Sequence, residues 1–152
     1  MFIDIARSRH SCRSFTDVPL TGEQRSLIME AGDLAPSSRS LRPVRLVPID
    51  DVDTIRSMAG CRAPGSTRAL TSATFAVIVA VESDVSDVWI EDASIASIMM
   101  QMEAEDIGLG SCWIQVRLRS NDDGPAEDHI RKVAGLPDDL IVESVIAFGN
   151  RA

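Results

Sequence analysis

Two clusters of basic residues near the N-terminus are the first groups in this sequence whose type and spacing could do chemistry. The first contains Arg7, Arg9, His10 and Arg13, and the second contains Arg39, Arg42 and Arg45. A planar guanidinium can hold a phosphate or carboxylate through two hydrogen bonds, so each cluster is a candidate anion site. The chain as a whole is acidic, with a formal net charge of −8. Solvated surface charges remain the alternative interpretation of both clusters.

Nucleophiles and metal ligands are sparse by comparison. The cysteines Cys12, Cys61 and Cys112 form no Cys-x-x-Cys pair, which excludes a disulfide framework and the usual zinc or iron–sulfur spacings. We therefore expect no metal site. Ser111 or Cys112 could act as a hydrolytic nucleophile with His10 as its base, but no residue near His10 in the sequence would orient such a base. Hydrolysis therefore stays a minor hypothesis.

Composition limits the class of protein. A chain of 152 residues with 45% hydrophobic and 25% charged residues is typical of one globular domain, expected here over residues 1–152. Its acidity disfavours nucleic acid and anionic membrane surfaces as partners. The longest apolar run, 75–81, is far shorter than the roughly 20 residues of a membrane helix. Asp4 and Arg7 interrupt the N-terminus, so no signal peptide is visible and we expect a cytoplasmic protein.

The hydrophobic pattern predicts helices and strands that alternate along the chain. Thr21 and Gln24 have the spacing of a capping box, which opens a helix that places Leu27, Ile28 and Leu34 on one face. The residues 36–43 form a loop between two prolines. Helices are predicted over 2–8, 21–35, 51–59, 92–107 and 126–134, and strands over 44–49, 75–81, 111–116 and 142–148.

Two of these elements carry further information. The run 75–81 is β-branched and apolar throughout, which predicts a central strand buried on both faces. The helix 92–107 has almost no polar face in its first half. A helix that is apolar nearly all round is buried either by its own domain or by a partner subunit.

Four segments in order make the sequence resemble a known family. They are Arg9-His10-Ser11-x-Arg13-x-Phe15, Ala35-Pro36-Ser37-Ser38-x-Ser40-x-Arg42-Pro43, the run from Gly108 to Ile114, and Ile130-Arg131-Lys132-Val133-x-Gly135-Leu136-Pro137. Together they resemble the nitroreductase-like family of FMN-dependent oxidoreductases, from about residue 3 to Gly149. The resemblance implies an α+β fold with a mostly antiparallel central sheet flanked by helices. It also implies a homodimer that shares two FMN sites across its interface.

The resemblance also implies a role for each segment in FMN binding. Arg9 and Ser11 would hold the phosphate, with His10 close by, and Arg13 would lie near N1 and O2 of the ring, where negative charge collects on reduction. The loop with Pro36, Ser37, Ser38, Ser40 and Arg42 would come from the partner subunit. Trp113, Ile114 and Gln115 would lie beside the ring, with the backbone N–H of Gln115 able to donate to N5.

Some positions depart from the family pattern. The family's loop usually has Asn and Gln where this chain has Ser40 and Arg42. The shorter Ser40 side chain would lose a flavin contact, and Arg42 would add a charge beside the ring or the substrate. Many relatives also have a C-terminal tail with a basic residue that returns to the phosphate, and Arg151 is the one residue here that could replace it.

Two functions follow from the resemblance. The first is an enzyme without a catalytic side chain of its own, which passes a hydride from NAD(P)H through flavin N5 to a small nitroaromatic or quinone acceptor. The second is a flavin-binding or flavin-depleted relative without turnover, which acts as a binding or interaction protein.

Overall fold

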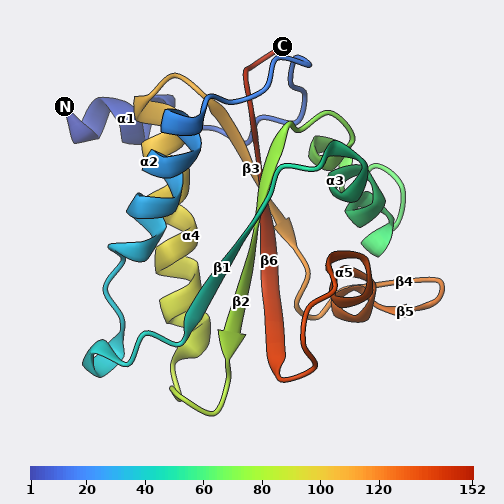
Figure 1. Ribbon diagram of the computed structural model, residues 1–152. Coiled ribbons are helices and arrows are strands. Elements are labelled where there is room, and N and C mark those ends of the chain that lie inside the picture. The colour runs from blue at the N-terminus through green and yellow to red at the C-terminus, as the bar shows by residue number, and fades with distance from the viewer.

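A four-stranded antiparallel sheet lies at the centre of the computed structural model, which describes residues 1–152. Helices cover both of its faces, α2 and α4 on one side and α3 and α5 on the other (Figure 1). This confirms the expected α+β fold. The helices are α1 (Phe2–Ser8), α2 (Gly22–Asp33), α3 (Val52–Met58), α4 (Trp89–Asp106) and α5 (Ala126–Ala134); the strands are β1 (Val44–Ile49), β2 (Phe75–Glu82), β3 (Gly110–Gln115), β4 (Ser120–Asn121), β5 (Gly124–Pro125) and β6 (Leu140–Gly149).

The strands of the central sheet lie in the order β1-β2-β6-β3, so β1 and β3 form its two edges. The prediction for 75–81 is confirmed, because β2 lies between β1 and β6 and its side chains are buried on both faces. Phe75 and Val77 pack under α2 and α4, whereas Ala76 and Ile78 face α3 and α5. Pro48 lies in the edge strand β1, where its missing N–H costs the sheet least.

Local sequence signals fixed several helix ends. The capping box is present, since the Thr21 hydroxyl accepts from the Gln24 N–H at 3.1 Å and the Gln24 side chain accepts from the Thr21 N–H at 2.9 Å. Asp51 caps α3 in the same way, by accepting from the Thr54 N–H at 2.9 Å. Gly135 ends α5 with a φ of 65°, a left-handed conformation that glycine adopts without a steric cost.

Other expectations about the helices need correction. Helix α2 ends at Asp33 rather than Ala35, and Leu34 is 67% exposed instead of joining Ile28 in the core. Helix α4 begins at Trp89, three residues before the predicted start. The Ser86 hydroxyl explains this earlier start, because it accepts from the Val88 N–H and donates to Asp92 further along the first turn.

Helix α4 is buried on one side only. Its residues Ala93, Ala96 and Met100 pack against the sheet and α2, but Ile98 and Met99 remain 42% and 38% exposed. The apolar surface of this helix is thus only partly buried within one chain. No helix combines the length and hydrophobicity that a membrane-spanning segment requires.

Candidate functional site

The segment after α1 lies against the start of β3 and the end of the chain. The Cys12 N–H donates to the Ser111 carbonyl at 2.9 Å, and Ser11 and Ser111 form a parallel β-bridge. Further along, Phe15 is bridged to Arg151, and the Phe15 N–H donates to the Ser72 hydroxyl at 3.1 Å. The first arginine cluster is therefore held at the edge of the sheet where β3 begins.

Two glycines allow this close approach. A Cβ on Gly110 would lie 2.8 Å from the Cys12 side chain, and a Cβ on Gly149 would lie 2.7 Å from Cβ and Cγ of Phe15. Neither contact is possible for any other residue without a shift of the backbone or of the whole Cys12–Phe15 segment. Both positions therefore need glycine to seat the segment that carries the arginines.

Arg9 and Arg13 of this cluster are not neutralised by the protein, whereas Arg7 pairs with Asp4. Arg9 is half-buried, yet its guanidinium makes no ion pair and no hydrogen bond within the chain. Arg13 is exposed and donates to the Ser11 carbonyl at 3.4 Å. Burial raises the pKa of the Cys112 thiol, and the nearby charges of Arg13 and Arg9 oppose that rise. The two guanidiniums therefore lie close to β3 and leave a positive site open there.

The outer edge of β3 offers backbone hydrogen bonds. The Ser111 carbonyl points away from β6 toward the N-terminal segment, and backbone groups of alternate residues in an edge strand point the same way. The Gln115 carbonyl follows this alternation, since it accepts from Arg62 at 3.4 Å. The N–H groups of Trp113 and Gln115 thus face outward from the sheet. The Ile114 side chain is buried in the core, and by the same alternation its backbone N–H and carbonyl face Val145 of β6.

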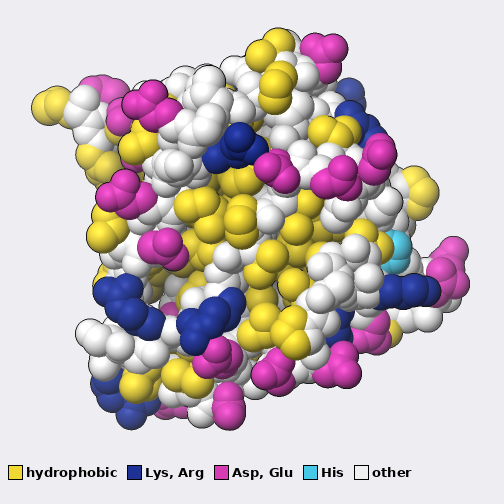
Figure 2. All heavy atoms as spheres, in the orientation of Figure 1, with side chains coloured by type: hydrophobic (Ala, Val, Ile, Leu, Met, Phe, Trp, Pro, Cys, Tyr) yellow, Lys and Arg dark blue, Asp and Glu magenta, His cyan; other side chains and the backbone are white.

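The proline-bounded loop lies elsewhere on the chain. It packs on the first turn of α4, where the Ser38 N–H donates to the Asp92 carboxylate at 2.9 Å. The Arg42 N–H donates to the Ser37 hydroxyl at 2.9 Å. Lys and Arg side chains gather at the lower left of the face in Figure 2, over this loop and the start of β1. The loop also borders a cavity of about 250 Å³ between α2, β1 and α4.

The backbone of this loop is strained. Arg39, Ser40 and Arg42 have φ values of 52°, 56° and 50°, in the left-handed region that residues with a Cβ adopt at a cost of order 1 kcal/mol each. Such conformations persist where the surrounding structure holds them, and they concentrate at ligand-binding segments. The strain is therefore consistent with a binding role for the loop.

Within one chain the segment that carries Arg9 and Arg13 is far from the proline-bounded loop; we call these two parts the half-sites. The proline-bounded loop contacts α4 at Asp92, whereas the chain end beside the arginine segment contacts α4 at Glu105. Thirteen residues of helix separate these contacts, which is roughly 20 Å along its axis. Figure 1 shows the same separation, with the chain termini at the top and the loop at the lower left. A site that uses both segments must therefore take them from two chains.

Arg151 and His10 have partners of their own. The guanidinium of Arg151 forms an ion pair with Glu105 of α4, so its charge is already balanced. The His10 Nδ1 lies 3.0 Å from the Ser8 carbonyl, and the ring is exposed. Arg151 is bridged to Phe15 of the segment that carries His10 and Arg9, but neither Arg151 nor His10 offers the uncompensated charge that Arg9 does.

Sequence reasoning missed a polar cluster on the face of β3 and β6 that α4 covers. Glu143 is 2% exposed and accepts a hydrogen bond from Ser94 of α4 at 2.8 Å. Arg117 follows β3, and its guanidinium lies 5.9 Å from the ring centroid of Trp89. A single acid inside the apolar run of β6 was the available signal.

The nitroreductase family matches nearly the whole chain, over residues 6–75 and 62–150. The chain belongs to the nitroreductase family. An FMN-dependent nitroreductase of Clostridium difficile is 37% identical, with a TM-score of 0.94 over 98% of this chain and 87% of that one. A protein of Archaeoglobus fulgidus with the provisional name NADH dehydrogenase/NAD(P)H nitroreductase is 27% identical over 93% of this chain and 80% of its own.

A further structure of the same fold contains the flavin. It is a nitroreductase, provisionally named, from Desulfovibrio desulfuricans in complex with FMN, with 24% identity and a TM-score of 0.81 over 99% of this chain and 86% of that one. The family expected from the four sequence segments is therefore confirmed, and FMN is the cofactor of the Clostridium difficile and Desulfovibrio desulfuricans proteins. The role of each site residue stays a prediction.

Proposed function

We propose that this chain is an FMN-dependent oxidoreductase that passes reducing equivalents from NAD(P)H to a small acceptor of the nitroaromatic or quinone type. The observation that carries the proposal is the half-buried guanidinium of Arg9, which has no partner in the chain and lies with Arg13 beside the open edge of β3. An acidic protein that keeps an unpaired cation there is built to receive an anion.

The residues present fit FMN. Its phosphate needs cationic and hydroxyl donors, which Arg9 and Ser11 supply. Its ring edge needs backbone donors in a fixed position, and the outward N–H of Gln115 is one. Arg13 would stabilise the negative charge that collects at N1 and O2 on reduction. Hydride transfer is the chemistry that FMN supplies when bound, so no protein acid or base is required.

We further propose that two chains build each site. The loop from Pro36 to Arg42 would come from the partner, because its own chain holds it roughly 20 Å from the arginine segment. The exposed side chains Ile95, Ile98 and Met99 on α4 give a second chain an apolar surface to cover. A two-fold axis beside α4 would bring opposite half-sites together.

A flavin-binding protein without turnover is the second candidate. Two observations favour it: Arg151 is committed to Glu105, and the strained loop presents Ser40 and Arg42 in place of the family's usual amides. In this case FMN would bind, but it would not pass electrons from NAD(P)H to an acceptor.

Titration of flavin-free protein with FMN tests the site. Charge-assisted hydrogen bonds contribute roughly 1.5–3 kcal/mol, so Arg9→Ala is expected to weaken FMN binding by roughly ten- to a hundredfold. Arg7→Ala is the matched control, since Arg7 is exposed and paired with Asp4. Equal affinities for the two variants, measured by flavin fluorescence, would remove Arg9 from the phosphate site.

A further inference from the structure

Glu143 occupies an irregular position in the sheet. Between β2 and β6 the register passes from Val79↔Ser144 to Ala80↔Val142, so Glu143 is the extra residue of a β-bulge. The N–H groups of both Val116 and Arg117 donate to its carbonyl, at 3.2 and 2.9 Å. A bulge redirects a side chain, and this one turns a carboxyl group toward α4.

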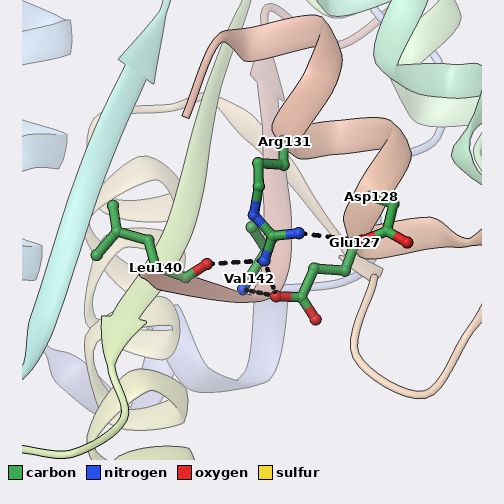
Figure 3. A network of polar contacts seen from close by, with 5 residues as sticks. All are labelled: Glu127, Asp128, Arg131, Leu140 and Val142. Atoms are coloured by element: carbon green, nitrogen blue, oxygen red, sulfur yellow. Dashed lines mark hydrogen bonds and ion pairs between the residues drawn. The ribbon is translucent and has the colours of Figure 1, made fainter. Parts of the chain in front are cut away.

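The strand is held firmly just before the bulge. Glu127 of α5 accepts from the Val142 N–H at 3.1 Å and pairs with Arg131, which also donates to the Leu140 carbonyl at 2.9 Å (Figure 3). These contacts fix the backbone on the face opposite α4. The orientation of Glu143 therefore follows from a braced backbone and not from a flexible loop.

The carboxyl group of Glu143 is only half satisfied. One oxygen, Oε1, accepts from the Ser94 hydroxyl, whereas Oε2 is buried and has no partner. An ionised carboxylate with an unpartnered buried oxygen is costly, so the protonated form is favoured. Burial accordingly raises the pKa of Glu143 to about 7, opposed by the Ser94 hydrogen bond, the charge of Arg117 and the neighbouring Ser144 hydroxyl.

The surroundings of Glu143 contain one charge that acts on it. Helix α4 contributes the Ser94 hydroxyl, β2 is apolar from Phe75 to Val81, and the segment after β3 contributes the guanidinium of Arg117. On the opposite face Arg131 of α5 pairs with both Glu127 and the exposed Asp128, and none of these charges shifts the pKa of Glu143. A charge that appears near this end of β3 would thus act on Glu143 with little competition.

The backbone of Glu143 is connected by hydrogen bonds to the outer edge of β3, because the Arg117 N–H donates to the Glu143 carbonyl at 2.9 Å. The Gln115 side chain donates to the Arg117 carbonyl at 2.9 Å and accepts from Trp113 Nε1 at 2.9 Å. Gln115 is also the register partner of Ser144, the neighbour of Glu143. The residue expected to meet flavin N5 is thus held by the same cluster that contains the buried acid.

We propose that Glu143 is a positioning and charge-tuning residue of the flavin site, which takes up a proton from solvent when a flavin at the edge of β3 is reduced. This rests on the proposed function. Two electrons from NAD(P)H add negative charge at the ring, and negative charge favours protonation of a nearby carboxylate. One O–H bond forms on Glu143, and the proton returns to solvent when the acceptor removes the electrons.

The proton count on reduction tests this directly. The pH dependence of the midpoint potential gives the number of protons that the FMN-loaded protein takes up on reduction. Near pH 7 we expect the wild type to take up as much as one more proton per two electrons than the Glu143→Gln variant does. Glu91→Gln is the matched control, because Glu91 is an exposed acid on α4, and it should behave as the wild type. Arg117→Gln should move the extra uptake to higher pH, since the cation that favours the carboxylate is lost.

The possible results distinguish the role of Glu143 from the proposed function of the protein. A bound, reducible FMN with the same proton count in wild type and Glu143→Gln would overturn the role of Glu143 and leave the proposed function intact. Protein that binds no FMN would overturn the proposed function and this inference with it. Extra uptake that Glu143→Gln abolishes, and that Arg117→Gln displaces, supports the inference.

Discussion

Replacing Glu143 by Gln should change how the stability of the protein depends on pH, whether or not flavin is bound. The pKa of this carboxyl group is raised from 4.5 in an unperturbed chain to about 7 in the folded protein. Between these values the folded state binds more protons than the unfolded state, so the free energy of unfolding falls as the pH rises. Well above pH 7 the carboxyl group is ionised in both states, so the free energy of unfolding no longer changes with pH.

The size of the effect follows from the two pKa values. At about 1.4 kcal/mol per pKa unit, the difference between the two pKa values corresponds to a total change of about 3 kcal/mol in the free energy of unfolding. Most of it, about 2–3 kcal/mol, falls between pH 5 and pH 8. Wild-type protein should lose this much stability relative to Glu143→Gln over that range, while the isosteric amide keeps the acceptor for Ser94.

Urea unfolding at a fixed protein concentration, followed by circular dichroism at pH 5, 6, 7 and 8, measures the difference. The comparison uses the slope against pH and not the absolute stability, because the amide introduces a donor of its own into the site. Glu91→Gln should follow the wild type. Parallel pH profiles for wild type and Glu143→Gln would refute the reasoning, since they would mean that Glu143 titrates alike in the folded and unfolded chain.

Two further predictions concern the assembly of the site. Gly149→Ala should destabilise the protein by about 1–3 kcal/mol and weaken FMN binding, because the new methyl displaces the segment that carries the arginines; Gly22→Ala, which meets nothing within 4 Å, should leave both thermal unfolding and FMN titration unchanged. If the site is shared, co-refolding Arg9→Ala with a loop variant such as Arg42→Glu, each deficient in FMN binding alone, should restore FMN binding, because one site of the mixed dimer is then intact. No restoration in a verified mixed dimer would contradict the shared site.

The fold could be predicted closely because its main signals are local or one-dimensional. The capping box at Thr21, the apolar run from Phe75 and the stop at Gly135 each depend on near neighbours. The early start of α4 could not be predicted, because it goes with hydrogen bonds of Ser86, which lies before the helix, to Val88 and Asp92. The hairpin β4–β5 was also missed, because its strands are two residues each and carry no hydrophobic period.

The site was predictable only in part. Arg9 and Arg13 could be chosen from their spacing and the family resemblance, but their lack of partners is a property of the folded chain. The same sequence reasoning could not anticipate that Glu105 would occupy Arg151. Nor could it place Glu143 inside the protein, since a bulge at Glu143 in β6, which appears only in the pairing with β2, decides which way the side chain points.

The visible spectrum of freshly purified protein, recorded before and after anaerobic addition of NADH or NADPH, tests the central claim most directly. The account predicts the absorption bands of a bound flavin, their bleaching by at least one of the two nucleotides, and their return when a nitroaromatic or quinone is added. A bound flavin that neither nucleotide bleaches would leave a flavin-binding protein and contradict the proposed enzyme. Protein that carries no flavin and cannot be loaded with FMN would contradict the site itself.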